Sequence, residues 1–224
     1  MFSKRKPLRL KKYDYSKPGY YFVTICAQDR QCLFGNVDRN QMILNRAGKI
    51  INQWWLTMSE RFENIGLDEY KIMPNHLHGI IVIKNVVGDD QCVGPNPKMG
   101  GHIGPPLQTM QKQTRQQQLL FRIIQLFKTK TTNGYINGVK NNQFPPFNKR
   151  LWQRSYCDHI IRNEKSLDKI RQYIRYNHLK WDEDIENPIF RSVIPRSPAP
   201  EQVRCGVNSA MRNLSKKYYE KLFE

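Results

Sequence analysis

The sequence is short of cysteine, of acidic residues and of long hydrophobic runs. Its five cysteines are odd in number and show no C-x-x-C spacing, so neither a disulfide framework nor a zinc ribbon is indicated. No segment approaches the run of about 18 apolar residues that a transmembrane helix requires. The first twelve residues carry six basic side chains instead of the apolar core of a signal peptide. We therefore expect reduced thiols, no membrane partner and a cytoplasmic location.

The scarcity of acidic residues leaves a strongly basic chain. Its 224 residues include 37 Lys and Arg but 19 Asp and Glu, a formal net charge of +18, and the segment 91–157 has ten basic residues and no acidic one. Such segregated charge favours a polyanionic partner, with nucleic acid first, through release of condensed counterions. A basic surface that only keeps the protein soluble is the alternative. The candidate DNA-binding residues are Arg5, Lys6, Arg9, Arg122, Lys128, Lys130, Lys149, Arg150 and Arg154.

The hydrophobic pattern predicts one α+β core. Strands are expected over residues 19–26, 68–73, 76–83 and 151–156, with Trp152 in the core. Three amphipathic helices are expected, the first over about residues 42–62. The apolar stripe of the second consists of Leu120, Ile123, Ile124 and Phe127. The third has Ser166 as its N-cap and an apolar stripe of Leu167, Ile170, Ile174 and Trp181. Gly, Pro and Gln dominate residues 86–118, which predicts a long loop insertion, and a short helix is expected over about 207–223.

The most informative motif is Met-Pro-Asn-His-Leu-His-Gly-Ile-Ile-Val-Ile at residues 73–83. Because side chains alternate along a strand, His76 and His78 point to one face while Leu77 and Ile81 point to the other. Two imidazoles on one face can ligate one divalent metal ion. Two packed or exposed histidines at a strand end are the ordinary alternative.

A metal ion held by two imidazoles needs at least one further oxygen ligand, and no acidic residue closely follows the histidines in the sequence. The carboxamide of Asn177 could supply this oxygen, although Asn177 could also be no more than a helix cap. Tyr173 lies one turn before Asn177 on the same helix face, where its hydroxyl could meet a metal-bound phosphate. Tyr173 is therefore the candidate nucleophile; Tyr156 and Tyr176 compete with it, and a packed helical aromatic is the structural alternative.

Several motifs, in this order, give the chain a family resemblance that extends from about residue 9 to residue 181. They are residues 9–10 with 13–15, residues 21–26 with 29–30, residues 73–81, residues 127–128, residues 151–156 with 158–163, and Tyr173-Ile174-x-x-Asn177. The sequence resembles the REP-associated tyrosine transposases, relatives of the single-tyrosine insertion-sequence transposases in the HUH endonuclease superfamily. The family pattern usually continues with proline after the asparagine, whereas this chain has His178.

The resemblance implies a ferredoxin-like HUH endonuclease fold, an α+β structure with a central antiparallel sheet flanked by helices. It places the two histidines on a central strand and the nucleophilic tyrosine on a C-terminal helix. The chain is accordingly divided into a basic arm (1–18), a tyrosine transposase domain (19–187) with the 86–118 insertion, and a C-terminal extension (188–224) with a short helix.

The resemblance also implies an activity. Tyr173 would attack a backbone phosphate of single-stranded DNA near a hairpin, forming a 5′-phosphotyrosine and a free 3′-hydroxyl, with Mg2+ or Mn2+ held by His76, His78 and Asn177. A second hydroxyl could reverse the step and join strands, and the enzyme would act as a monomer or homodimer. Two alternatives stay open: a domesticated DNA-binding protein that does not cleave, and an RNA-binding or RNA-processing protein, because aromatic strands and basic loops also suit RNA.

Overall fold

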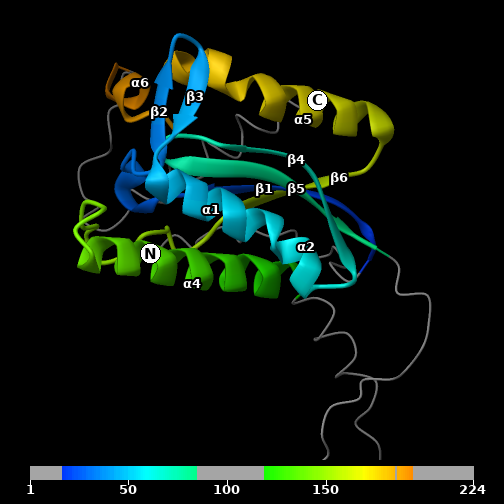
Figure 1. Ribbon diagram of the computed structural model, residues 1–224. Coiled ribbons are helices and arrows are strands. Elements are labelled where there is room, and N and C mark those ends of the chain that lie inside the picture. Colours follow the sequence, from blue (N-terminus) through cyan, green and yellow to red (C-terminus); the bar gives the residue numbers. More distant parts are fainter. Residues whose placement is uncertain (1–16, 85–118, 185, 194–224) are drawn as a thin grey trace, which may run out of the picture.

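The computed structural model describes residues 17–84, 119–184 and 186–193, and at its centre lies a four-stranded antiparallel sheet. The strands are β1 (Gly19–Cys26), β4 (Ile65–Ile72), β5 (His76–Ile83) and β6 (Cys157–Ile161), in the spatial order β4-β5-β1-β6. Helices cover both faces of this sheet (Figure 1). The predicted α+β class, with a central antiparallel sheet flanked by helices, is confirmed.

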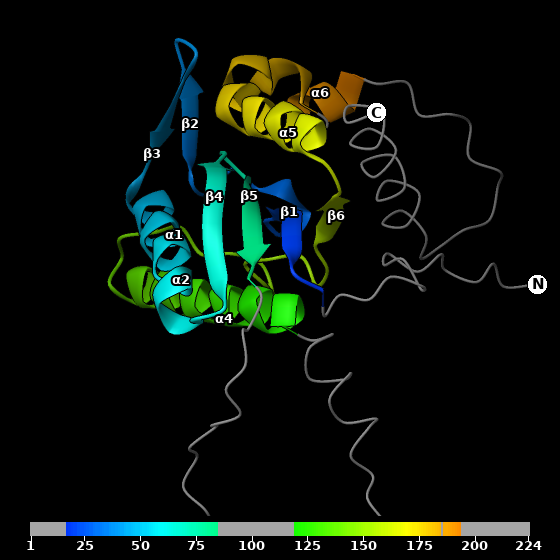
Figure 2. The same cartoon turned by 90° about the vertical axis from the view of Figure 1, so that its right-hand side faces the viewer.

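One face of the sheet carries the main hydrophobic core. It is covered by α1 (Arg46–Leu56), α2 (Met58–Arg61) and α4 (Leu119–Lys140) (Figure 2). Leu77 and Ile81 of β5 pack there, together with the predicted stripe of α4, which is buried: Leu120, Ile123, Ile124 and Phe127. Gly79 also faces this side, and a Cβ atom at its position would collide with the ring of Trp55. Glycine therefore allows the Trp55 ring of α1 to pack directly on the strand.

The opposite face is covered by α5 (Glu164–Tyr176). Its buried residues Leu167, Ile170 and Ile174 belong to a second hydrophobic cluster. The sheet contributes its remaining members, Phe22, Ile80 and Ile161. Because Ile80 follows His78 by two residues, α5 covers the same face as the histidines.

Two ion pairs tie α5 to the edge strand β4. The pairing of β4 with β5 is interrupted by a bulge that contains Asp68 and Glu69. Asp68 accepts two hydrogen bonds from Arg171, at 3.0 Å from Nε and 2.7 Å from Nη2, and Glu69 accepts one from Arg175 at 2.8 Å. The Arg171 guanidinium lowers the pKa of the Asp68 carboxyl. The bulge thus presents two carboxylates to the helix that carries Tyr173.

The strands predicted over 19–26 and 76–83 are confirmed at both ends, whereas other boundaries differ. The strand predicted from residue 68 begins at Ile65, and the helix predicted over 42–62 begins at Arg46 and is interrupted at Thr57. Residues before α1 form a hairpin of β2 (Gly35–Asp38) and β3 (Gln41–Leu44). Its turn residues Arg39 and Asn40 have positive φ angles of 46° and 61°. Two-residue turns of this kind usually have the sequence Asn-Gly, so the Arg-Asn sequence did not predict a turn here.

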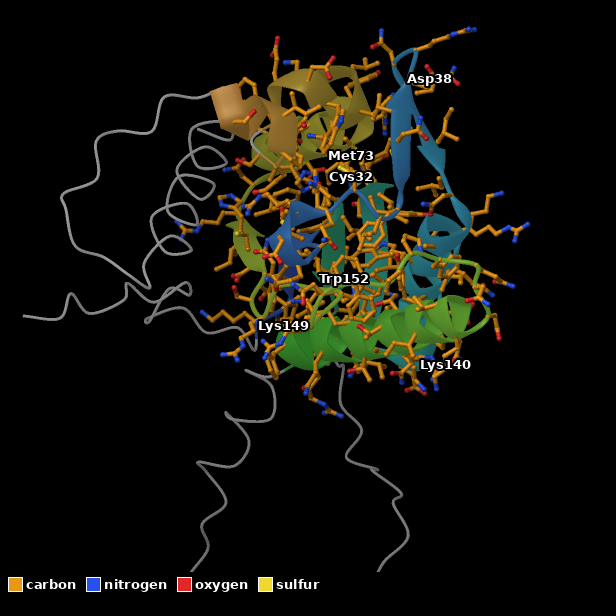
Figure 3. All side chains as sticks on the ribbon, turned by 90° about the vertical axis from the view of Figure 1, so that its left-hand side faces the viewer. Cys32, Asp38, Met73, Lys140, Lys149 and Trp152 are labelled. Atoms are coloured by element: carbon orange, nitrogen blue, oxygen red, sulfur yellow. The ribbon has the colours of Figure 1, made fainter. Side chains whose placement is uncertain are left out.

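The strand predicted over 151–156 is wrong, because the fourth strand is β6 (Cys157–Ile161). The preceding segment forms only an isolated bridge between Trp152 and Ala27. Lys128 explains the difference: its Nζ donates hydrogen bonds to the carbonyl oxygens of Gln153 at 2.8 Å and Ser155 at 3.0 Å. Trp152 is buried, as expected, between the sheet and α4 (Figure 3).

The ends of α5 also differ from the prediction. Asn163, not Ser166, is its N-cap, and Oδ1 of Asn163 accepts a hydrogen bond from the backbone N–H of Ser166 at 2.8 Å. The helix ends at Tyr176 instead of continuing to Trp181, and the 3-10 helix η2 (Asn177–Glu183) and the short helix α6 (Pro188–Val193) follow.

Most of the basic arm (1–18), the 86–118 insertion and the helix expected over 207–223 lie outside the described residues, so the domain boundaries stay predictions. Cys26, Cys32 and Cys157, which are described, form no disulfide bond among the described residues. Across the described ranges, every helix is too short or too polar to cross a membrane.

Candidate metal centre and nucleophile

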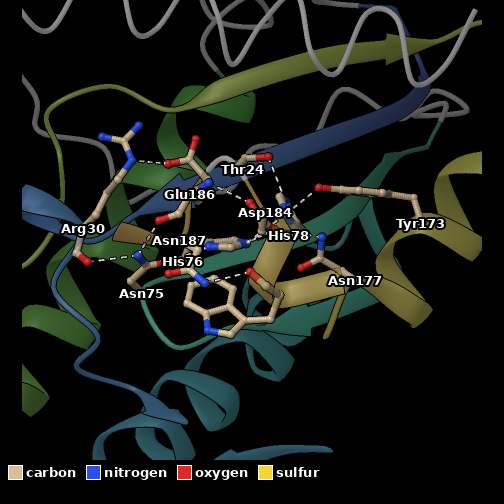
Figure 4. A network of polar contacts seen from close by, with 11 residues as sticks. Thr24, Arg30, Asn75, His76, His78, Tyr173, Asn177, Asp184, Glu186 and Asn187 are labelled. Carbon is tan, nitrogen blue, oxygen red and sulfur yellow. Dashed lines mark hydrogen bonds and ion pairs between the residues drawn. The ribbon is translucent and has the colours of Figure 1, made fainter. Parts of the chain in front are cut away.

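His76 and His78 project from β5 onto the face that α5 covers, as their spacing predicts, and both are completely buried. Their ring centroids lie 4.4 Å apart and their Nε2 atoms 2.9 Å apart (Figure 4). Two ligand atoms that bind one ion at about 2.1 Å and at right angles are about 3.0 Å apart. The spacing of the two nitrogens therefore fits a shared divalent ion.

Asn75 determines which nitrogen of His76 is available. Its Nδ2 donates hydrogen bonds to the carbonyl oxygens of Arg30 at 2.9 Å and Glu186 at 2.8 Å, so Oδ1 is the acceptor. That oxygen lies 2.8 Å from Nδ1 of His76, which must therefore carry the proton and leave a lone pair on Nε2. Outer hydrogen bonds of this kind orient metal-binding imidazoles.

His78 has a comparable outer partner. Oγ1 of Thr24, the residue opposite His78 on β1, lies 2.9 Å from its Nδ1. The ring also stacks on Phe22, with centroids 5.4 Å apart. These two contacts fix the ring so that its Nε2 faces His76.

Asp184, at the end of η2, is a site residue that the sequence reasoning missed. Its buried carboxylate oxygen Oδ2 lies 3.9 Å from Nε2 of His76. The ligand atoms of His76, His78 and Asp184 all lie within 4.8 Å of one another. The sequence offered Asn177 alone as the oxygen ligand, whereas the structure adds a carboxylate, because the chain after α5 folds back over the histidines. No local sequence pattern marks Asp184 for this position.

Polar contacts hold the segment of Asp184 against the sheet. Glu186 is buried and ion-paired with Arg30, and its backbone N–H donates to Oδ1 of Asp184 at 2.7 Å. The carbonyl oxygen of Glu186 accepts a hydrogen bond from Asn75. The residue that orients His76 thus also helps to position Asp184.

Tyr173 is brought to the histidines from α5. Its hydroxyl oxygen lies 3.2 Å from Nε2 of His78, and the two ring centroids lie 5.2 Å apart. The ring packs edge-on against Phe22, and the side chain is half-buried. The hydroxyl therefore lies beside the nitrogens that could hold the ion.

Asn177 is buried next to this group, directly after the last residue of α5. Its Nδ2 donates a hydrogen bond to Oδ2 of Asp184 at 3.1 Å. Its Oδ1 is buried and has no hydrogen-bond partner among the described residues. An unpartnered buried oxygen is costly unless it binds a ligand, so Asn177 fits the role of an additional oxygen ligand.

The electrostatics of the group suit metal binding. Burial lowers the pKa of His76 and of His78, and the pKa of His78 is lowered further by the neighbouring His76. Burial raises the pKa of Asp184, because its charged form is deprived of water. A neutral imidazole is the form that binds metal, and a bound cation would offset the cost of the buried carboxylate. These three residues could hold a metal ion.

Two of the candidate DNA-binding residues that the structure describes, Lys128 and Lys130, lie away from this centre on α4. Lys128 donates to two backbone carbonyls, and Nζ of Lys130 lies 5.7 Å from the ring centroid of Trp54, on the sheet face opposite the histidines. Exposed positions are held by Arg122, Lys149, Arg150 and Arg154. Arg5, Lys6 and Arg9 lie outside the described residues.

The competing tyrosines lie in different environments. Tyr156 packs against the core cluster on the far face of the sheet, under Nζ of Lys128 at 5.9 Å from its ring centroid. Tyr176 lies on α5 with 52% of its surface exposed. Tyr173 is the candidate whose hydroxyl lies beside the histidines.

Comparison with known proteins gives one clear relative and several distant structural neighbours, two of which are described here. No family model matches the chain. An uncharacterized protein of Haemophilus influenzae is 38% identical over 183 residues, which cover 80% of this chain and 91% of that protein. Among solved structures, a REP-associated tyrosine transposase bound to a REP hairpin is 16% identical, with a TM-score of 0.42 over 88% of this chain and 96% of its own. A candidate transposase from Deinococcus radiodurans is 13% identical, with a TM-score of 0.36 over 76% of this chain and 98% of its own.

Proposed function

We propose that this chain, which belongs to one family with the Haemophilus influenzae protein, is a metal-dependent nuclease and strand transferase that acts on single-stranded DNA near hairpins. The observation that carries the proposal is the position of the Tyr173 hydroxyl, 3.2 Å from one of two buried imidazoles whose Nε2 atoms face each other. A nucleophile beside a candidate metal centre is the arrangement that phosphoryl transfer requires. The motifs shared with the tyrosine transposases and the net charge of +18 also support it.

The proposed reaction exchanges one phosphodiester for another. The Tyr173 oxygen forms a bond to the phosphorus, and the bond between phosphorus and the 3′-oxygen breaks. The phenol gives up its proton to solvent and the departing 3′-oxygen takes one up, so the products are a 5′-phosphotyrosine and a 3′-hydroxyl. A second 3′-hydroxyl can reverse these steps and join strands. No external energy source is needed.

His76, His78 and Asp184 would hold the metal ion, with Asn177 offering a fourth atom through its unpartnered Oδ1. When bound, a divalent ion, proposed to be Mg2+ or Mn2+, withdraws charge from the phosphate oxygens and favours attack. Asn75 leaves the lone pair of His76 on Nε2, and Thr24 holds the His78 ring in place. The ring contact with Phe22 holds the Tyr173 side chain in place.

A covalent capture experiment tests the proposal. The full chain is incubated with Mn2+ and a pool of hairpin-forming single-stranded DNAs with randomised stems and flanks, then denatured, and the DNA that remains attached is sequenced. We expect an adduct joined through the 5′-phosphate, with a shared sequence beside the hairpin. Tight hairpin binding without an adduct would instead identify a DNA-binding protein that does not cleave, and adduct formation on RNA alone would identify an RNA-processing enzyme.

A further inference from the structure

Lys71 lies on β4 directly opposite His78 of β5. Residues opposite each other in an antiparallel pair project to the same face, and their Cβ atoms are about 4.5–5.5 Å apart. The neighbours of Lys71 on the strand confirm the alternation, since Tyr70 and Ile72 pack into the core on the other face. The Lys71 side chain therefore shares a face with the histidines and Tyr173.

The Lys71 side chain is half-buried, and its ammonium group has no partner in the described part of the chain. No hydrogen bond or ion pair to its Nζ is found there, and Glu69, the nearest acidic neighbour in sequence, is bonded to Arg175 at 2.8 Å. Partial burial lowers the pKa of Lys71 and the charge of Glu69 raises it. An ammonium group without an acceptor in the described chain is available to bind an anion from outside it.

His178 is a second residue on this side of the candidate metal centre. It follows Asn177 in η2, and its pKa is lowered first by burial and then by the charge of Lys71, so the two side chains are near each other. Nδ1 of His178 is buried and has no hydrogen-bond partner among the described residues. The Lys71 ammonium and the His178 ring thus lie near each other on the side of β4, next to the residue that carries His78.

We propose that Lys71 binds a phosphate of the DNA strand at or next to the bond that Tyr173 attacks, so that the strand runs from the metal centre across β4. The proposal rests on the function proposed above and adds a residue that the sequence motifs do not include. It contrasts with Lys128, Arg171 and Arg175, whose charges are matched by acceptors within the chain. A positive charge at this point would favour binding of a single strand by both attraction and hydrogen bonding.

The test measures DNA affinity in a chain that cannot cleave, Tyr173→Phe, using an oligonucleotide recovered by covalent capture. Lys71→Met removes the ammonium and keeps the apolar stem, and we expect affinity to fall by about tenfold to a hundredfold and the salt slope by about 0.7. Lys71→Arg should recover most of the affinity. Lys49→Met, an exposed lysine of α1 on the far face, is the matched control and should change neither quantity.

Replacing one DNA phosphate at a time with a neutral methylphosphonate distinguishes a direct contact of Lys71 from a structural effect of its substitution. If Lys71 binds one phosphate, that phosphate should lie within one nucleotide of the cleaved bond. When it alone is neutralised, the proteins with and without Lys71→Met should bind the DNA with equal affinity. A difference that persists at every position, or an affinity that Lys71→Met does not alter, overturns the proposal. Failure of the unmodified chain to form an adduct overturns the proposed function instead, so the two failures are distinguishable.

Discussion

Oδ1 of Asn75 lies 2.8 Å from Nδ1 of His76, the next residue in the chain. The same amide donates to the carbonyl oxygens of Arg30 and Glu186. One buried side chain therefore holds the histidine tautomer, the turn after β1 and the segment that carries Asp184. Residues from three distant parts of the sequence are joined at this point.

Asn75→Asp should destabilise the fold while preserving the shape of the side chain. The carboxylate can still accept from His76, but it cannot donate to the carbonyls of Arg30 and Glu186, which are left unsatisfied beside a buried charge. We expect the free energy of unfolding to fall by about 2–4 kcal/mol, measured by urea denaturation.

The matched control is Asn163→Asp at the N-cap of α5. There Oδ1 only accepts a hydrogen bond, from the N–H of Ser166, and a negative charge suits a helix N-terminus. This change should leave stability within about 0.5 kcal/mol of the original chain. If Asn75→Asp and Asn163→Asp lower the free energy of unfolding equally, the role assigned to Asn75 is wrong.

Lys128 is expected to stabilise the segment before β6 rather than to bind DNA. Lys128→Met leaves the carbonyls of Gln153 and Ser155 without their donor, so the free energy of unfolding should fall by about 1–3 kcal/mol in thermal or urea denaturation. Arg122→Met, at an exposed position of the same helix, should have little effect on stability. Unchanged stability together with a shallower salt dependence of DNA binding would show that Lys128 contacts phosphate instead.

The ion pair of Asp68 with Arg171 should make the docking of α5 sensitive to acid. Because Arg171 lowers the pKa of Asp68 in the folded state, the pair contributes fully above the unfolded pKa of about 4 and is lost as the pH falls through the lower folded value. Asp68→Asn should cost about 1 kcal/mol at neutral pH, and the difference should shrink in acid, as measured by urea denaturation at several pH values. Glu164→Gln, an exposed and more distant partner of Arg171, should show no such convergence.

The parts of the fold that the sequence predicted are those fixed by local periodicity. Alternation in residues 76–83 placed both histidines on one face, and the stripe of α4 marked its buried side. Tyr173 and Asn177 could be paired because one helical turn separates them, and the structure brings both to the histidines. Their roles as nucleophile and metal ligand stay predictions.

The features that the sequence could not reveal depend on contacts between distant segments. Asp184 reaches the histidines because η2 turns back and Glu186 pairs with Arg30. The segment 151–156 has strand-forming residues, but Lys128 donates to two of its carbonyl groups, those of Gln153 and Ser155. Each of these outcomes is decided by a partner that no local pattern indicates.

Asp184→Asn tests the ligand that only the structure identified. The change keeps the side-chain volume and removes the charge, so Mn2+ affinity, measured by isothermal titration calorimetry, should fall by at least about tenfold. Asp182→Asn, at an exposed position of η2, should bind Mn2+ as the original chain does. If Asn177→Leu weakens binding and Asp184→Asn does not, the third ligand is Asn177 and Asp184 only orients it.

Tyr173→Phe separates the nucleophile from the metal centre. It removes the attacking oxygen but keeps the ring that packs against Phe22, so folding, Mn2+ affinity and hairpin binding should persist while the covalent adduct disappears. The adduct is measured by denaturing electrophoresis of labelled DNA. Tyr176→Phe and Tyr156→Phe are the matched controls, since one is exposed and the other packs on the far face of the sheet, and both variants should still form the adduct. An adduct that survives Tyr173→Phe and is lost in one control would move the nucleophile to that residue, and an adduct in all three variants would exclude single-tyrosine chemistry.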